Sequence, residues 1–263
     1  MLEEKIVHFV EWKKVADEDL AKTLQDVRSW GVTDIVAHPI WYMKDQENKG
    51  FLKKVAAMIK DAGLKTPACH ALWGKKFDLA NEDEARRIAS MEDHKAFLYD
   101  LAEMGVTTYT LHLGMHKVND SWDFSWDQIR RSVDALLPVA EKTSIALALE
   151  NGGEAMNELR NLAKLVKEYA HPQVGMCFDT GHANCYSATS LFEILDFMKD
   201  DIVTCHMHDN YGSYDDHNPP GSGNIPWDKL IAALKACPRM HHAETESGDW
   251  DQDSWNKFYS VWK

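Results

Sequence analysis

Residues 144–181 read SIALALENGGEAMNELRNLAKLVKEYAHPQVGMCFDTG, which contains one complete strand–helix–strand unit. Residues 144–151 and 173–181 are short apolar runs typical of buried strands, and residues 155–169 repeat apolar side chains at helical spacing. Strands that alternate with helices predict a parallel sheet. This segment therefore predicts an α/β fold.

The same alternation extends in both directions from this unit. Further strands are predicted at 5–10, 33–39, 65–72, 107–114, 201–208 and 239–247. Further helices are predicted at 19–31, 51–63, 85–105, 125–143, 190–200, 227–237 and 251–263. Eight strand–helix units in 263 residues predict a single (β/α)8 TIM barrel domain over residues 1–263. A doubly wound open sheet is the alternative, but the sequence has no glycine-rich GxGxxG turn.

Several residues predict where helices begin, end or break. Gly31, Gly63 and Gly105 follow helical segments and are typical C-terminal stops. Ser125 can cap the N-terminus of the helix that follows it. Pro138 lies inside that same segment and favours a kink or a break there.

The charge balance and the hydrophobic pattern exclude several classes of partner. The chain has 29 Lys and Arg against 42 Asp and Glu, a net charge of −13, which disfavours nucleic acid and anionic membranes as partners. No apolar run approaches the length of about eighteen residues that indicates a membrane helix. The first residues show no secretory signal, so a cytoplasmic location is the expectation.

The five cysteines form no CxxC pair, and most lie in apolar runs. This pattern favours buried free thiols over a disulfide framework or a structural zinc site. They are Cys69, Cys177, Cys185, Cys205 and Cys237.

Ionisable side chains gather where the predicted strands end. In a barrel these ends meet at one mouth, where functional residues lie. A single histidine there is most often a hydrogen-bonded structural group, but here seven of the eight strands carry His, Asp or Glu at or near their ends, and Lys and Arg are almost absent. A divalent cation with nitrogen and oxygen ligands would balance this charge. The residues are His38, His70, His112, Glu150, Asn151, Asp179, His182, His206, His208, Asp215, His217, Glu244 and Glu246.

The motifs around these residues resemble the xylose isomerase-like barrel superfamily, which includes sugar isomerases and epimerases, inosose dehydratase and type IV apurinic endonucleases. The motifs are ALENGG (148–153), FDTGHAN (178–184), HMHDN (206–210), DDH (215–217), PPGSGNIPW (219–227) and AETES (243–247). The resemblance covers nearly the whole chain. It also implies that two barrels often pair, which leaves a homo-oligomer open.

The resemblance implies a metal site with one to three divalent ions, drawn from manganese, zinc, cobalt and magnesium. For the sugar isomerases and epimerases it implies four ligands, Glu150, Asp179, His206 and Glu244. His206 is preferred over His208, and Glu244 over Glu246, because they match the family's strand ends best. For the endonucleases it implies five more ligands, His70, His112, His182, Asp215 and His217.

The resemblance implies an isomerase or epimerase that acts on a sugar, sugar phosphate or polyol through an enediolate. Glu150 and Glu244 are the expected acid and base, and His182, His208, Trp41 and Trp73 are expected substrate contacts. The alternative is an endonuclease-like phosphodiesterase with several zinc ions, which the acidic charge disfavours. A barrel that only binds metal or sugar is the third reading. No arginine lies between His206 and His217, which departs from the ketose 3-epimerases.

Overall fold

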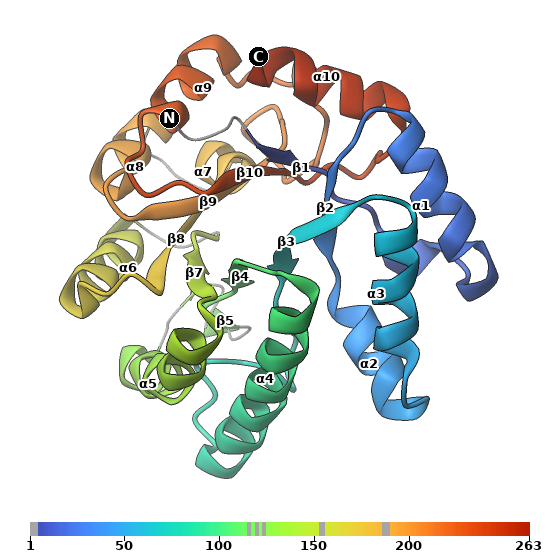
Figure 1. Cartoon of the computed structure of the whole chain (residues 1–263). Coiled ribbons are helices and arrows are strands. Elements are labelled where there is room, and N and C mark those ends of the chain that lie inside the picture. Colours follow the sequence, from blue (N-terminus) through green and yellow to red (C-terminus); the bar gives the residue numbers. More distant parts are fainter. Residues whose placement is uncertain (1–4, 115–116, 119–120, 123–124, 153–155, 186–189) are drawn as a thin grey trace.

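Eight parallel strands form a nearly closed barrel in the computed structural model, with helices around its outside (Figure 1). The structure describes residues 5–114, 117–118, 121–122, 125–152, 156–185 and 190–263. The strands lie in the order β1-β10-β9-β8-β7-β4-β3-β2. They are β1 (Ile6–Val7), β2 (Asp34–Ala37), β3 (Lys65–His70), β4 (Thr108–Leu111), β7 (Ala146–Glu150), β8 (Val174–Asp179), β9 (Ile202–Met207) and β10 (His242–Thr245). The predicted (β/α)8 barrel is confirmed.

The strands β1 and β2 close the barrel through a bridge between His8 and Ile35. The His8 amide donates to the Asp34 carbonyl at 2.9 Å, and the Val36 amide donates to the His8 carbonyl at 3.0 Å. The His8 ring is buried, with Nδ1 3.0 Å from Thr245 Oγ1 and Nε2 3.0 Å from the Trp250 carbonyl. Burial lowers the pKa of His8 to about 4, so this ring is neutral and joins the last strand to the first.

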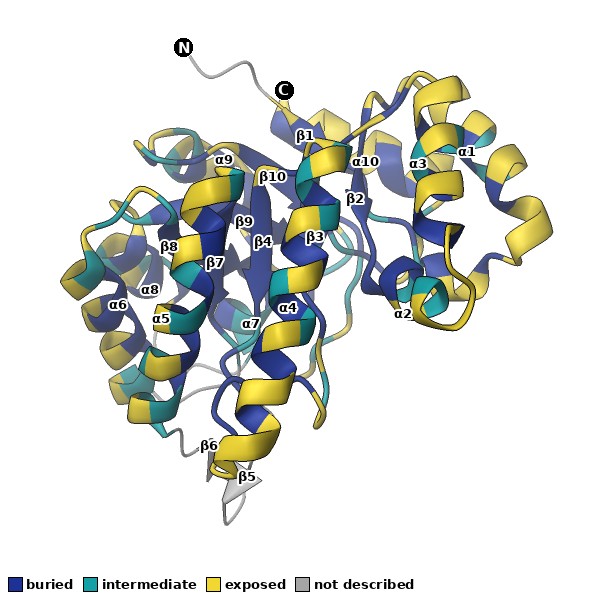
Figure 2. Cartoon of the chain, turned by 60° about the horizontal axis from the view of Figure 1, so that its bottom comes forward, coloured by how far each residue is buried: buried dark blue, intermediate teal, exposed yellow. Residues whose placement is uncertain are grey.

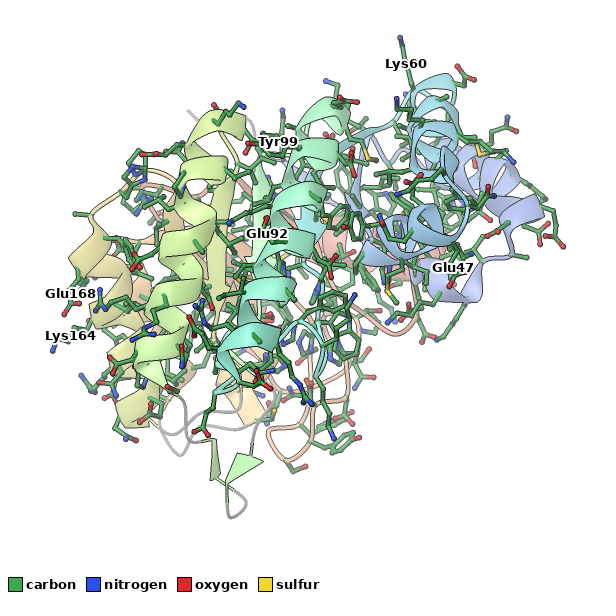
Figure 3. All side chains as sticks on the ribbon, turned by 90° about the horizontal axis from the view of Figure 1, so that it is seen from below. Glu47, Lys60, Glu92, Tyr99, Lys164 and Glu168 are labelled. Carbon is green, nitrogen blue, oxygen red and sulfur yellow. The ribbon has the colours of Figure 1, made fainter. Side chains whose placement is uncertain are left out.

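The eight predicted helices are present. They are α1 (Leu20–Ser29), α3 (Phe51–Asp61), α4 (Glu84–Met104), α5 (Trp126–Thr143), α6 (Met156–Tyr169), α8 (Leu191–Met198), α9 (Trp227–Lys235) and α10 (Gln252–Trp262). Their buried faces turn toward the strands and their exposed faces outward (Figure 2). The outward faces carry charged side chains such as Lys60, Glu92, Lys164 and Glu168 (Figure 3). This is the amphipathic pattern from which they were predicted.

The barrel also contains short elements that were not predicted. They are the 3-10 turns Trp12–Lys14 and Asp17–Asp19, the helices α2 (Pro39–Glu47) and α7 (Thr180–Cys185), and the antiparallel pair β5 (Lys117–Val118) and β6 (Ser121–Trp122). No helix was predicted between the strand at 33–39 and the helix at 51–63, where α2 lies. Pro39 at the first helical position and His38, whose Nδ1 accepts from the Ile40 amide, start a helix there.

Two of the predicted helix signals behave differently in the structure. Ser125 lies at the N-cap of α5, but its side chain makes no capping hydrogen bond. The helix α5 continues through Pro138, so of the predicted kink or break the break does not occur. Gly105 has a φ of 84° at the end of α4, as expected for a glycine stop. Gly153 of the ALENGG motif and Ala155 of the predicted helix lie outside the described residues.

Small side chains pack together in one cluster between β7, β8 and β9. Ala146, Ala148, Cys177 and Val203 form this cluster, separate from the large apolar core under the helices. A Cβ on Gly175 would lie 2.4 Å from a methyl carbon of Val203, so the backbone here requires glycine. Since these side chains are short, they leave room for the ionisable groups at the strand ends.

The loop after β9 is organised by one buried carboxylate. Asp209 Oδ2 accepts from the amides of Gly221 and Gly223 and from the Trp227 indole at 2.9–3.0 Å. Its Oδ1 accepts from the amides of Asn210 and Ile225. The carboxylate therefore fixes both ends of the glycine-rich loop.

Among the described residues, none of the helices combines the length and the apolar character needed to cross a lipid bilayer.

Replacing Asp209 with alanine should strongly destabilise the protein. Each buried donor that loses its acceptor costs about 1–3 kcal/mol, and several donors lose theirs together. We expect Asp209→Ala to lower the free energy of unfolding by about 3 kcal/mol or more, measured by urea denaturation. The matched control is exposed Asp216 in the same loop, whose change to alanine should stay within about 0.5 kcal/mol. Equal effects of the two changes would contradict this role.

Candidate metal centre

Ten ionisable side chains meet where the barrel strands end. Four of these strands supply His70, Glu150, Asp179 and His206 from their last residues. The others come from the segments that follow the strands, and they are His112, His182, His208, Asp215, His217 and Glu246. They form three groups in which one ligand atom from each residue lies within 4.8 Å of the others.

The central group consists of Glu150, Asp179, His206 and Glu246. His206 Nδ1 lies 2.8 Å from Glu150 Oε1, 3.0 Å from Glu246 Oε2 and 3.8 Å from Asp179 Oδ2. The side chains of Glu150, Asp179 and His206 are at most 3% exposed, whereas that of Glu246 is 15% exposed. Glu246 is therefore the member of this group that a substrate can reach most easily.

Glu246, rather than the predicted Glu244, completes the central group. The two glutamates are two residues apart and point to the same side of their strand, so the sequence alone could not separate them. In the structure Glu244 Oε1 accepts from Thr204 Oγ1 at 2.6 Å. Its Oε2 lies 3.5 Å from Nε2 of His206, the ring nitrogen opposite the one that faces the central group. Glu244 is not a member of the three groups, and its assignment as a ligand stays a prediction.

The His70 group consists of His70, His112 and Glu150. The Nε2 atoms of the two histidines are 2.9 Å apart, and His112 Nε2 lies 3.2 Å from Glu150 Oε2. Glu150 thus presents one oxygen to this group and the other to His206. The indole of Trp73 stacks on His112 with 20° between the planes and is 45% exposed. Lys13 Nζ lies 4.7 Å from the Trp73 ring centroid, on the rim of the mouth.

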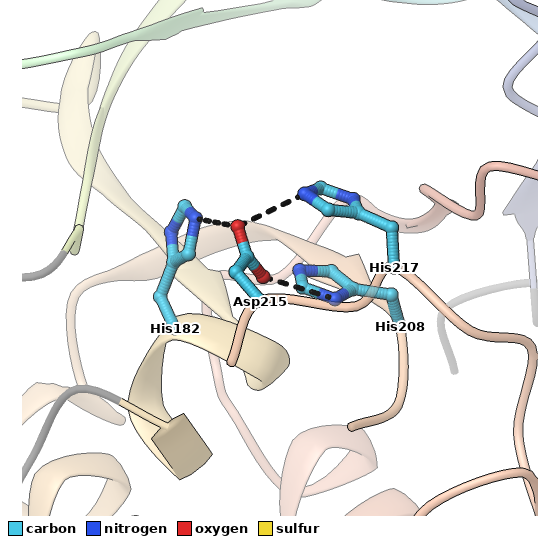
Figure 4. Close-up of side chains that lie close together, drawn as sticks. All are labelled: His182, His208, Asp215 and His217. Carbon is cyan, nitrogen blue, oxygen red and sulfur yellow. Dashed lines mark hydrogen bonds and ion pairs between the residues drawn. The ribbon is translucent and has the colours of Figure 1, made fainter. Parts of the chain in front are cut away.

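The Asp215 group consists of His182, His208, Asp215 and His217 (Figure 4). Asp215 Oδ2 lies 3.3 Å from His182 Nε2 and 3.1 Å from His217 Nε2, and its Oδ1 lies 3.6 Å from His208 Nδ1. His208 stacks on His217 with ring centroids 4.0 Å apart. Its Nε2 lies 3.0 Å from Asp179 Oδ1, which links this group to the central group.

The three groups contain six imidazoles and four carboxylates, and burial and the neighbouring carboxylates change the pKa of several of these histidines. Burial alone would lower the pKa of His217, but the hydrogen bond to Asp215 raises it to about 10. Burial alone would also lower the pKa of His182. The charge of Asp179 and the hydrogen bond to Asp215 raise this pKa well above its ordinary value. Burial lowers the pKa of His112 to about 4. Protons on the imidazoles near Asp215 therefore supply positive charge that a bound cation would replace.

The donor set fits divalent cations. Four buried atoms of the three groups make no hydrogen bond within the described residues, and they are Glu150 Oε2, His208 Nδ1, Asp215 Oδ1 and Glu246 Oε2. In the same part of the chain, the ion pairs of these carboxylates are all with histidines. Imidazole and carboxylate ligands suit zinc, manganese and related ions. The histidines that balance the charge of a buried carboxylate can therefore also bind a metal.

The predicted substrate contacts lie in different surroundings. Trp41 is 1% exposed and packs on Trp12 with ring centroids 5.2 Å apart, so its side chain lies in the core. His208 is fully buried in the Asp215 group. Trp73 lies exposed at the rim, and His182 is 14% exposed.

Cys177 lies against the central group, although the sequence reasoning treated it only as a buried thiol. It forms a further group with Glu150 and His206. Burial raises the pKa of the Cys177 thiol, so the sulfur stays protonated. Its position two residues before Asp179 on the same strand was the signal that could have placed it there.

Curated relatives cover most of the chain at low identity. An uncharacterized protein of Sinorhizobium fredii, y4fM, is 25% identical over 257 residues, covering 87% of this chain and 81% of the relative. A probable endonuclease 4 of Mycobacterium bovis is 28% identical over 171 residues, covering 61% of this chain and 66% of the relative.

Solved structures share the fold along nearly the whole chain. A 3-keto-D-glucoside 4-epimerase from E. coli has a TM-score of 0.77 at 20% identity and covers 98% of this chain and 99% of its own. D-Psicose 3-epimerase from Clostridium cellulolyticum H10 has a TM-score of 0.77 at 15% identity, with the same coverage. The IOLI protein, solved with a zinc atom, has a TM-score of 0.73 at 18% identity and covers 98% of this chain and 96% of its own.

A family profile agrees with the barrel and with the place of the ionisable groups in it. The profile described as xylose isomerase-like TIM barrel matches residues 24–246, which include all three groups. The chain belongs to the xylose isomerase-like TIM barrel family.

Proposed function

We propose that the protein is a divalent-metal-dependent isomerase or epimerase of a sugar-like small molecule. The observation that carries the proposal is the central group, in which Glu150 and Glu246 reach the same His206 nitrogen from different strands. The family and the epimerases among the similar folds support it. The net charge of −13 favours a small substrate over nucleic acid.

Glu150, Asp179, His206 and Glu246 would hold the catalytic metal. When bound, this cation supplies Lewis acidity that polarises a substrate carbonyl and acidifies the neighbouring C–H bond. Glu246, the more exposed glutamate, accepts that proton, and Glu150 or Glu246 returns one to complete the isomerisation. The burial of this group limits access of competing water to the reacting carbon.

Two groups at the rim would hold the substrate. The exposed face of Trp73 offers an apolar surface for a sugar ring beside His112. His182, with its Nδ1 2.9 Å from the Asn151 carbonyl, is fixed in orientation and would contact a hydroxyl. Trp41 and His208 are not part of this arrangement because both are buried.

Protein purified without chelator or histidine tag should contain metal. We expect at least one manganese, zinc or cobalt ion per chain by elemental analysis, because the central group brings three carboxylates and one imidazole together. Glu246→Gln should reduce the content by about one ion, whereas Asp216→Asn, which changes an exposed loop carboxylate, should not. Absence of metal even after ions are added back would refute the proposal.

Proton abstraction should be visible as isotope exchange. The metal-loaded protein, incubated in D2O with a panel of ketoses and 3-keto-glucosides, should place deuterium on the carbon next to the carbonyl of at least one of them, detected by NMR. Glu246→Gln should slow this exchange by about 10²–10⁴-fold. Failure of the metal-loaded wild type to exchange any member of the panel would count against the isomerase proposal.

A second function, metal-dependent phosphodiester hydrolysis, is favoured by one observation. Each of the three groups contains ligands that the endonuclease resemblance implies, and together they use His70, His112, His182, Asp215 and His217. The similarity to a probable endonuclease 4 points the same way. A bridging set of cations would neutralise a phosphodiester and its leaving oxygen.

Cleavage of duplex DNA with a single abasic site separates the two functions. We expect the zinc-loaded protein to leave the duplex intact at physiological salt, because the acidic chain opposes DNA binding. Zinc-dependent nicking that His217→Gln abolishes would instead establish the hydrolase. His217 is the suitable position because it belongs to the Asp215 group and not to the central group.

A further inference from the structure

A second layer of polar side chains lies inside the barrel next to the central group. It contains Thr108, Thr204, His242 and Glu244, all of which are buried. Among the described residues, the ion pairs of Glu244 are with His206 and His242. A carboxylate in such a place is costly unless its neighbours compensate it, so its role needs a physical account.

The contacts hold one oxygen of Glu244 firmly. Thr204 Oγ1 donates to Glu244 Oε1 at 2.6 Å, and His242 Nε2 lies 3.4 Å from the same oxygen. His242 Nε2 is itself 2.9 Å from Thr108 Oγ1. These neighbours fix the plane and direction of the carboxylate.

The other oxygen of Glu244 faces His206. Oε2 is buried and makes no hydrogen bond within the described residues, and it lies 3.5 Å from His206 Nε2. The opposite ring nitrogen, Nδ1, faces Glu150 and Glu246. Glu244 and Glu246 therefore lie on opposite sides of one imidazole, and only Glu246 is on the side of the central group.

We infer that Glu244 is a positioning residue that holds His206 for metal binding. Oε2 lies 3.5 Å from His206 Nε2, so a small approach lets it accept the Nε2–H and leaves the Nδ1 lone pair directed at the central group. A neutral imidazole carries one ring proton, so fixing that proton on Nε2 selects the tautomer that can bind a metal through Nδ1. The carboxylate also makes the ring a stronger ligand. This inference rests on the proposed metal site of the central group.

The test compares two replacements of Glu244 in the full chain. Glu244→Gln keeps an oxygen that can accept from Nε2–H, whereas Glu244→Met keeps the length of the side chain and removes the acceptor. Zinc affinity of the metal-free protein is measured by competition with a chromophoric chelator, and the ligand field of bound Co²⁺ by absorption. Circular dichroism and thermal melting of the metal-free proteins verify that each variant folds.

Glu244→Met should weaken the binding of one zinc equivalent by about 10–100-fold and shift the Co²⁺ bands. Glu244→Gln should have a smaller effect in the same direction. Glu246→Gln removes a ligand, so it should reduce the binding of the same equivalent more strongly. The control is His217→Gln, which belongs to another group and should leave this equivalent unchanged. If Glu244→Met does not fold, the Co²⁺ spectrum and zinc affinity of Glu244→Gln test the inference.

Three results would overturn the inference. If the folded Glu244 variants keep wild-type zinc affinity and Co²⁺ bands, the glutamate does not position His206, and the proposed function stands. If Glu244→Gln matches Glu246→Gln in both measurements, Glu244 is itself a ligand. If the wild type binds no zinc, cobalt or manganese, this inference and the proposed function fail together.

Discussion

The buried carboxylates at the mouth impose the constraint on which the site depends. Glu150, Asp179, Asp215 and Glu246 lie close together, and their ion pairs within the described residues are all with histidines. Lysine or arginine would hold such charge permanently, whereas an imidazole can give up its proton to a solvent base and its lone pair to a metal. Histidine can therefore balance the buried charge when it is protonated and bind a metal when it is not.

The fold could be predicted from sequence because each strand and helix carries its own local signal. The apolar runs at 144–151 and 173–181, with the helical spacing between them, suffice to predict parallel strands. The short elements were missed because nothing local marks them. The helix α2 begins at His38 and Pro39, while its remaining residues, IWYMKDQE, do not repeat apolar side chains at helical spacing.

The candidate site could likewise be predicted only in part from the sequence. Barrel geometry and motif resemblance together predicted which residues gather, since parallel strands end at one mouth. They could not rank Glu244, in β10, against Glu246, which follows the end of that strand, because alternation predicts the same direction for residues two apart. They also could not show that Trp41 lies in the core, which depends on its packing against Trp12. Depth and packing partners are properties of the assembled barrel and not of any one segment.

The closure of the barrel is uneven, and this has a consequence for how the molecule opens. Between the described strands, β8 pairs with its neighbours over four registered positions on each side, whereas β1 meets β2 through one bridge. Most of the ligands come from β3 to β9 and the segments that follow them, whereas Glu246 follows Thr245, which contacts His8 of the bridge. A seam with few hydrogen bonds is where a barrel separates at the lowest free energy. Fluctuations that part β1 from β2 can therefore admit solvent to the wall of the barrel near His8, while the ligands on β3 to β9 keep their arrangement.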